Sequence, residues 1–161
     1  MNRNYTSSEY AVIVSNIRKF WANPSITTDV MVGFAGESEE DFKASLDFVT
    51  SIGFAKVHVF PYSRREGTKA WDMSGHLTNA VKAERAAIMG EAVEKSRVNF
   101  MNSQIGTVNK VLFETVTDGR YFGLTENYTP VVVDSDTDIC SKILEVKIVE
   151  VKGELCIGKL I

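Results

Sequence analysis

The chain has 161 residues, of which 44% are apolar and 24% are charged, an ordinary composition for a folded globular protein. Its net charge is −3: residues 1–102 hold 12 basic and 12 acidic side chains, and residues 103–161 hold 6 and 9. Neither part has the positive balance of a stand-alone nucleic-acid binder. No apolar run approaches the ~20 residues of a membrane span, and the polar N-terminus lacks a signal core. We therefore expect a cytoplasmic protein that makes no membrane contact.

The first elements in chain order are a helix and a β-α-β unit. Thr6 to Glu9 has the form of a helix capping box, and apolar residues at three- and four-residue steps predict a helix over 7–22. The mostly apolar run 26–32 predicts a strand covered on both faces. Ser38 and Gly53 have the residue types of helix caps, and a second short strand, 57–60, follows. Parallel pairing with a right-handed crossover is expected.

A polar loop over 63–78 and a helix over about 79–101 complete the first part. From residue 104 onward, β-rich runs alternate with turns, and Asp118-Gly119 and Lys152-Gly153 are hairpin signals. Five short strands in so few residues favour a small closed antiparallel barrel. The predicted fold class is therefore α/β, with a partial (β/α) barrel segment at 1–102 and a small β-barrel at 103–161. The five expected strands are Val108–Val116, Arg120–Thr125, Pro130–Val133, Ser141–Val151 and Glu154–Ile161.

Two parallel strands are too few to bury both of their faces. We therefore expect either a fragment of a larger barrel or a chain that borrows strands from a partner. Open strand edges and apolar helix faces also favour self-association. Whether Met1 is a true start stays open.

Several side chains follow the two expected strands or lie within them. Asp29 interrupts an apolar strand, so it either faces the barrel interior near a ligand or serves as a structural acid bonded to backbone or to neighbouring threonines. Arg64 and Arg65 come just after the second strand, where they would meet a carboxylate or phosphate, or would pair with nearby acids on a surface loop. A lone strand histidine, His58, is expected to be packed rather than catalytic.

The second part carries aromatic and basic residues near its turns. Such aromatics either stack on bases or fill the barrel core, and Lys110, Lys142, Lys147 and Lys159 form one basic face if the strands align them. Cys140 and Cys156 are expected to be buried, inert thiols, because a cytosolic disulfide is rare and no histidine lies nearby to complete a zinc site. The clustered residues are Arg120, Tyr121, Phe122, Asn127 and Tyr128.

Four segments resemble one enzyme family closely. TTDVMVGFAGESEEDF is similar to T-T-D-x-I-V-G-F-P-G-E-T-E-E-D-F, and VHVFPYSRREGT to H-V-F-P-Y-S-x-R-x-G-T, of the radical-SAM tRNA methylthiotransferases. MNRNYT is similar to their M-x-R-x-Y-T, and the final segment with GLTENYTPVVV resembles their terminal TRAM domain. The H-V-F-P-Y-S and T-E-N-Y wording favours the branch that modifies threonylcarbamoyladenosine next to the anticodon. Ala35 stands where the family usually has proline.

The resemblance implies S-adenosylmethionine and [4Fe–4S] clusters as cofactors of the parent enzyme and tRNA as its partner. The family's C-x-x-x-C-x-x-C triplet is absent from this chain, as are the auxiliary-cluster cysteines. We therefore expect no catalytic residue and no bound cofactor in this chain, which would be inactive without the missing N-terminal part. The implied cofactor-binding residues are Asp29, Gly33, Gly36, Tyr62, Ser63 and Arg64, and the expected RNA-binding residues are Arg65, Arg120, Tyr121 and Tyr128.

Several alternatives stay open. The glycine turn either borders the cofactor or needs glycine for geometry alone, and Glu37 either binds a ligand or favours the helix N-terminus. The whole chain could instead be a non-catalytic RNA-binding or interaction protein that retains the TRAM domain. A third reading, a β/α enzyme that binds phosphate at the glycine turn, is disfavoured by the acids at 37–41.

Overall fold

The computed structural model describes residues 4–161, so the first three residues of the MNRNYT motif lie outside the described part. The described chain forms two compact units, one of residues 4–22 and Ile26–Arg97, the other of Asn23–Ser25 and Val98–Ile161. The short segment Asn23–Ser25 thus belongs to the second unit although both its neighbours belong to the first. Within residues 4–161, no helix combines the length and apolar character that crossing a bilayer requires.

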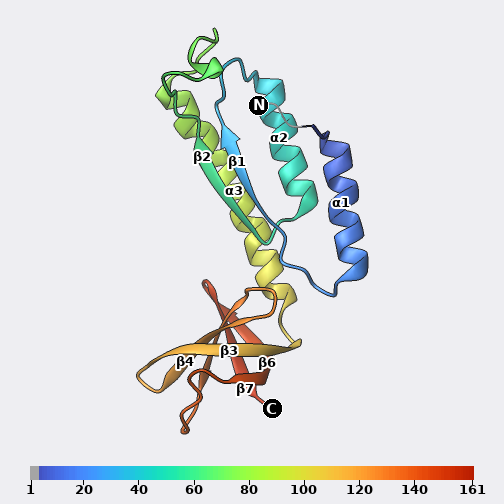
Figure 1. Ribbon diagram of the computed structural model, residues 1–161, viewed down its shortest axis with the longest axis vertical. Helices are drawn as coiled ribbons and strands as arrows, with labels where there is room; N and C mark the ends of the chain where they lie inside the picture. Colours follow the sequence, from blue (N-terminus) through green and yellow to red (C-terminus); the bar gives the residue numbers. More distant parts are fainter. Residues whose placement is uncertain (1–3) are drawn as a thin grey trace. The chain divides into compact units, whose positions relative to one another are not determined.

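The first unit is built on a β-α-β motif with two further helices (Figure 1). Strands β1 and β2 pair in parallel and in register from Thr27 with Lys56 to Val32 with Pro61. The predicted mixed α/β class is confirmed, and the long helix runs two residues further than expected. The elements are α1 (Ser7–Phe20), β1 (Thr27–Val32), α2 (Glu39–Ile52), β2 (Lys56–Pro61), the 3-10 turn Lys69–Trp71 and α3 (Asn79–Ser103).

Local sequence fixes the ends of α1 and α2. Thr6 and Ser38 each accept a hydrogen bond from the backbone N–H three residues on, and Glu9 and Asp41 bond back to the cap, which completes two capping boxes. Hydrogen bonds from the Ser38 backbone and hydroxyl lower the pKa of Asp41. Gly53 ends α2 in the left-handed conformation at φ 63°.

Within residues 4–161, only one face of the β1–β2 sheet is covered. Val30, Val32, Val57 and Val59 pack with all three helices around Phe54 and Met89. The opposite face exposes Thr27, Asp29, Lys56, His58 and Phe60. The expectation that β1 would be covered on both faces was therefore wrong for this chain, because two strands with helices on one side leave the other side open.

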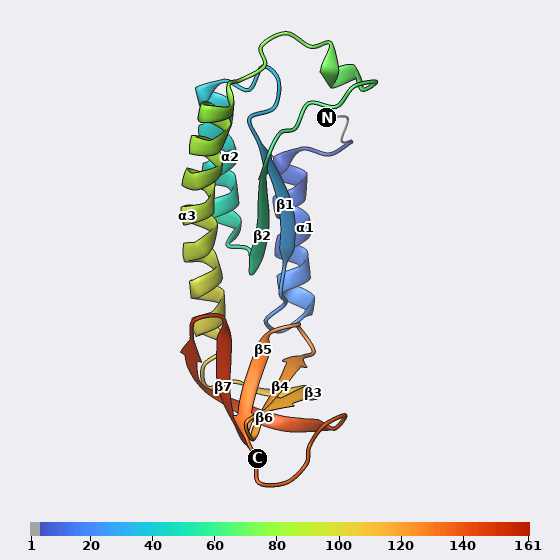
Figure 2. The ribbon, with the colours of Figure 1, turned by 90° about the vertical axis from the view of Figure 1, so that its left-hand side faces the viewer.

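The second unit is a closed five-stranded barrel, in the order β3-β4-β5-β7-β6 (Figure 2). All five expected strands are present. One feature of the prediction needs correction: β5 and β7 pair in parallel, so the barrel is not wholly antiparallel. The parallel pair closes the barrel, because β7 forms a hairpin with β6 and on its other side pairs with β5. The strands are β3 (Val108–Thr117), β4 (Arg120–Thr125), β5 (Pro130–Asp134), β6 (Ile143–Lys152) and β7 (Leu155–Leu160).

A polar cluster ties the segment Asn23–Ser25 to the barrel. Asn127 donates from Nδ2 to the Asn23 carbonyl at 2.9 Å, and Asn23 donates to Gln104 Oε1 at 2.6 Å. Gln104 is fully buried. Thr125 and Thr129 bond to Asn127 Oδ1. Asn127, which the sequence placed in the aromatic and basic cluster near the turns, therefore uses its side chain to hold this segment.

Candidate functional site

The glycine turn after β1 is closed by the protein's own groups. Gly33 N donates to Glu37 Oε1 at 2.9 Å, and Gly36 N donates to the Gly75 carbonyl at 2.9 Å. A Cβ on Gly33 would lie 2.6 Å from Lys82 Cγ. Gly33 and Gly36 have φ of 74° and 80°, a region that favours glycine. In this structure the glycines therefore serve turn geometry and close packing of the chain on itself.

One buried arginine holds Glu37 in place. Arg85, 6% exposed, donates from Nη1 to Glu37 Oε1 at 2.6 Å and to the Glu37 carbonyl at 3.0 Å, and from Nη2 to Glu39 Oε2 at 2.9 Å. Its guanidinium also lies 5.2 Å from the centre of the Phe42 ring. Burial alone would lower the pKa of Arg85, but the hydrogen bonds to Glu37 and Glu39 outweigh it and the pKa is raised. Glu37 is thus a structural link between the turn and α3.

Around this turn, three buried polar atoms find no hydrogen-bond partner within residues 4–161: the Tyr62 hydroxyl, His76 Nδ1 and Arg85 Nε. Tyr62 is 8% exposed. The rings of Tyr62 and His76 stack at 6.1 Å, Phe34 meets Tyr62 edge-on at 5.0 Å, and Lys82 Nζ lies 5.6 Å from the Tyr62 ring centre. His76 Nε2 is 3.3 Å from the Trp71 carbonyl, which only accepts, so in the neutral ring Nδ1 is an acceptor. The cluster offers one hydroxyl donor and one acceptor to a ligand.

The polar loop uses one of its two arginines internally. Arg64 donates from Nε to the Trp71 carbonyl at 2.9 Å, and its guanidinium lies 4.3 Å from the centre of the Trp71 ring. Ser63 and Arg65 are exposed. The Arg65 carbonyl accepts from the Thr68 hydroxyl at 2.7 Å. Arg65 is therefore the arginine of this pair whose side chain is placed to meet an outside anion.

Asp29 and His58 come together on the open face of the sheet. They are direct partners in the parallel register, and both are exposed. The expectation that His58 would be packed was wrong, because alternation places it opposite Val57 and Val59, which face the helices. A carboxylate and an imidazole thus share one uncovered surface.

The expected RNA-binding residues of the barrel do not share one environment. Arg120 is half-exposed and pairs with Asp134 at 3.5 Å. Tyr121 is 8% exposed and belongs to the barrel core, so it offers no free ring face to a base. Tyr128 is 79% exposed and adopts φ 61°. Base stacking by Tyr121 stays a prediction that this geometry does not favour.

The sequence predicted one basic face formed by four lysines, on the condition that the strands align them, and the structure pairs two of the four. Lys147 on β6 and Lys159 on β7 are direct cross-strand partners, and both are exposed. No ion pair found within residues 4–161 includes either lysine. Like charges directly opposite on neighbouring strands are destabilising, so an anion would relieve this pair. Of the other two lysines, Lys110 is paired in register with Glu145, and Lys142 donates to the Asp138 carbonyl at 2.7 Å.

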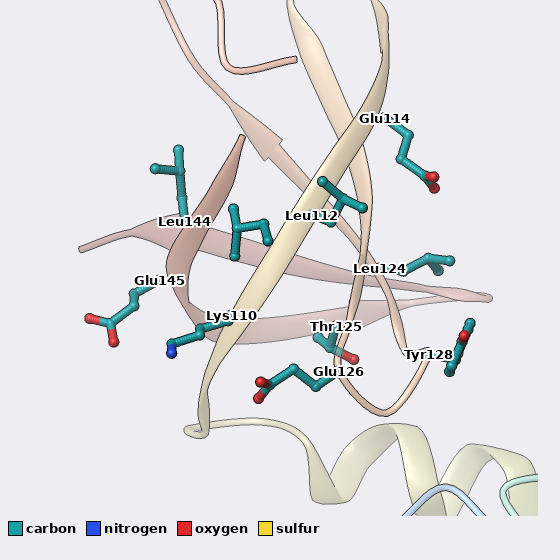
Figure 3. A pocket seen from close by; sticks show the side chains of 10 residues that line it. Lys110, Leu112, Glu114, Leu124, Thr125, Glu126, Tyr128, Leu144 and Glu145 are labelled. Atoms are coloured by element: carbon teal, nitrogen blue, oxygen red, sulfur yellow. The ribbon is translucent and has the colours of Figure 1, made fainter. Parts of the chain in front are cut away.

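The barrel also carries a groove of about 720 Å³ on its outer surface (Figure 3). Apolar side chains from three neighbouring strands line it, with Tyr128 at one end and three carboxylates around it. The lining residues are Lys110, Leu112, Glu114, Leu124, Thr125, Glu126, Tyr128, Ile143, Leu144 and Glu145.

The thiols do not form a metal centre. Cys156 is fully buried in the barrel core, and burial raises its pKa to about 11. Cys140 is half-buried, and both thiols are free. Within residues 4–161, no group of histidine, cysteine and acidic side chains is arranged to hold a metal ion. The residues present do not fit the cysteine ligation that an iron–sulfur cluster needs.

Comparison with known proteins identifies relatives along the whole chain. It is 32% identical over 163 residues to a tRNA-2-methylthio-N(6)-dimethylallyladenosine synthase of Ruthia magnifica subsp. Calyptogena magnifica, covering 100% of this chain and 37% of that protein. It is 33% identical to the threonylcarbamoyladenosine tRNA methylthiotransferase MtaB of Bacillus subtilis (strain 168), covering 93% and 34%. It is 35% identical to a tRNA-2-methylthio-N(6)-dimethylallyladenosine synthase of Maricaulis maris (strain MCS10), covering 92% and 33%. No protein-family model matches the chain.

The chain is a relative of the tRNA methylthiotransferases. The resemblance drawn from the sequence motifs is thereby confirmed. The chain spans only about a third of the length of these relatives. The relatives include proteins named for two different modified adenosines, so they do not distinguish between the two branches.

Sequence reasoning missed three features of the candidate site. The Arg85 link was overlooked because Arg85 lies 48 positions after Glu37, and the sequence gives no signal for that contact. The role of His76 was missed because a loop histidine has no periodic context. The acid-rimmed groove was detectable in part: Leu112 and Glu114 alternate with the core residues Val111 and Phe113, which marks them as outward-facing.

Proposed function

We propose that this chain is the barrel-end and RNA-docking part of a tRNA methylthiotransferase, and that it is inactive without the remainder of such an enzyme. The observation that carries this proposal is the similarity over the whole chain to about a third of each relative. In this proposal the protein acts in the cytoplasm on tRNA. The branch that we favour from the H-V-F-P-Y-S and T-E-N-Y wording modifies threonylcarbamoyladenosine.

The first unit would contribute one wall of the cofactor-binding barrel. S-adenosylmethionine, together with an iron–sulfur cluster held elsewhere in the enzyme, would supply radical chemistry. The orphaned Tyr62 hydroxyl and His76 Nδ1 support a polar ligand at the end of β2. Asp29 would face the reaction chamber from the open sheet face, and Ser63 would border the ligand from the loop. Gly33, Gly36 and Arg64 would act indirectly, by shaping the turn and the loop.

The barrel would dock tRNA through phosphate contacts. The Lys147–Lys159 pair is the strongest support, because two exposed lysines are direct register partners on neighbouring strands and form no ion pair within residues 4–161. Arg120 and Arg65 would add positive charge. Since the barrel part is acidic overall, we expect weak binding with a strong salt dependence.

A chimera tests the catalytic part of the proposal. The matching third of the Bacillus subtilis MtaB protein would be replaced by this chain, and 2-methylthio modification of tRNA would be measured by mass spectrometry of nucleosides. We expect modification of threonylcarbamoyladenosine, and none from this chain alone. Modification of dimethylallyladenosine instead would overturn the branch assignment. A chimera that folds and binds tRNA but never modifies it would support the second candidate, a non-catalytic RNA-binding protein.

A charge variant tests the docking part. Lys147→Glu with Lys159→Glu should lower tRNA affinity of the isolated chain more than tenfold at low salt, while Lys19→Glu with Lys69→Glu, which changes the net charge equally in the other unit, should lower it only slightly. Fluorescence anisotropy with labelled tRNA measures both. Equal losses in the two variants would mean that net charge, rather than this pair, governs binding.

A further inference from the structure

The groove on the barrel has an exposed apolar floor that crosses three strands. Leu112 on β3 is the register partner of both Leu124 on β4 and Ile143 on β6, so the three residues form one row across the strands. Leu112 is 41% exposed and Ile143 is 64% exposed. The barrel core lies on the other side of these strands, and Leu112, Leu124 and Ile143 are not part of it. A continuous apolar row on the outside of a closed barrel is typical of a contact surface.

Tyr128 extends this surface at a cost in backbone energy. Its φ of 61° is uncommon for a residue with a Cβ, and the conformation is held by a hydrogen bond from Tyr128 N to the Thr125 carbonyl at 2.9 Å. The same turn is fixed through Asn127. Strained residues that a surrounding network holds in place concentrate at functional sites, and an exposed tyrosine is a frequent anchor of protein interfaces.

The charges around the groove determine what it accepts. Glu114, Glu126 and Glu145 are exposed at its edge, against the single Lys110. Phosphate oxygens would be repelled by three carboxylates, so a nucleic acid is disfavoured here. Lysine or arginine side chains would be attracted, and apolar side chains would cover the row of leucine and isoleucine.

We propose that this groove, lined by Leu112, Leu124, Tyr128 and Ile143 and edged by Glu114, Glu126 and Glu145, binds a polypeptide segment that alternates apolar with basic side chains. The partner is another protein and not the tRNA, which would use the Lys147–Lys159 pair. The groove proposal does not depend on the proposed enzyme function, because it rests on the barrel surface alone.

The test uses the ¹⁵N-labelled whole chain and a capped eight-residue synthetic peptide of alternating leucine and lysine. We expect saturable NMR shift changes concentrated at the amides of Leu112, Leu124 and Ile143. Glu126→Lys with Glu145→Lys should raise Kd at least tenfold. The matched control is Asp136→Lys with Glu154→Lys, which changes the charge of the same barrel equally but outside the groove, and it should raise Kd less than threefold. Ile143→Ser should also weaken binding, because it removes an exposed apolar contact.

Five outcomes would overturn the proposal. The first is the absence of binding by this peptide. The second is an equal loss of affinity in the groove and control variants. The third is equal binding of a leucine–glutamate peptide. The fourth is an anticodon stem-loop RNA that shifts the groove amides in place of the peptide. The fifth is a dilution series of the free chain that shifts the same amides, which would make a second copy the occupant. Retained dispersion of the variant spectra shows that a loss reflects the surface and not unfolding.

Discussion

The buried guanidinium of Arg85 holds the loop that follows β1 through hydrogen bonds to Glu37 and Glu39. Arg85 links Glu37 and Glu39 to α3, and Glu37 in turn accepts from Gly33 N. Removing one member of a buried ion pair leaves the other charge without compensation, which costs far more than losing an exposed pair. The Glu37 side chain is 13% exposed, whereas that of Glu39 is 78% exposed. The two carboxylates should therefore respond very differently to mutation.

Arg85→Met should destabilise the first unit by about 3–5 kcal/mol, whereas Glu39→Gln should cost less than about 1 kcal/mol. Both tryptophans, Trp21 and Trp71, lie in this unit, so urea unfolding followed by tryptophan fluorescence measures it directly. Adding Glu37→Gln to Arg85→Met should recover part of the loss, because it removes the stranded charge. No recovery would show that the side chains matter for packing rather than for charge.

The buried thiol of Cys156 should make the barrel sensitive to alkaline pH. Its pKa in the folded state is about 11 against an ordinary 9.0. When folding raises the pKa of a thiol, the protein has its full stability at any pH below the pKa of the unfolded chain. That stability falls as the pH rises toward the pKa of the folded chain. We therefore expect a loss of about 2–3 kcal/mol between pH 9 and pH 11. Barrel unfolding followed by near-UV circular dichroism measures it. Cys156→Val should lose correspondingly less over the same range, and parallel pH curves for the two proteins would contradict the assignment.

At the scale of elements, two strands of the barrel depend on glycine for close approach. A Cβ on Gly158 would overlap Val146 Cγ1, and a Cβ on Gly123 would overlap the Leu112 carbonyl oxygen. Neither glycine has a positive φ. Glycine is therefore required at these positions because a side chain would not fit, and not because of the backbone conformation. By contrast, a Cβ on Gly90 in α3 would meet nothing within 4 Å.

Gly158→Ala should destabilise the barrel by about 1–3 kcal/mol, because the neighbouring valines must move. Gly90→Ala should stabilise α3 by about 0.5–1 kcal/mol, since glycine is a poor helix former. Thermal unfolding by circular dichroism compares the two variants with the parent chain. Stabilisation by Gly158→Ala would mean that the barrel repacks more freely than its contacts suggest.

At the scale of the whole molecule, two cores account for the described chain. One is built from α1, α2, α3 and the covered sheet face, and the other fills the closed barrel. The segment Asn23–Ser25 is grouped with the barrel through Asn23, although it lies 73 positions before Val98. The two sets of core residues do not overlap, which favours separate unfolding of the two units.

A piece of residues 98–161 should fold as a barrel but be less stable than the barrel in the whole chain by about 1–3 kcal/mol. The reason is that Gln104 and Asn127 lose their hydrogen bonds to Asn23. Hydrogen exchange of the core amides of Val111 and Val146 gives the comparison. Asn23→Ala in the whole chain should reproduce part of the loss, and identical exchange in all three proteins would show that this segment does not stabilise the barrel.

The sequence determined most elements, since their signals are local. The capping residues Thr6 and Ser38, the terminating Gly53 and the strand alternation of 108–160 all depend on neighbours along the chain, so helices and strands were predictable to within a few residues. The sequence motifs were also sufficient to indicate the family, because several spaced motifs occur in the same order.

Only the tertiary structure decided which side chains share a surface. The contact of Arg85 with Glu37, the pairing of Lys147 with Lys159 and the burial of Tyr121 depend on how distant segments pack and on strand register, where a shift of one residue reverses every face. The exposure of Asp29 and His58 depends on how many strands surround them. Local sequence therefore gave the elements, whereas long-range packing determined which residues are available to a ligand or a partner.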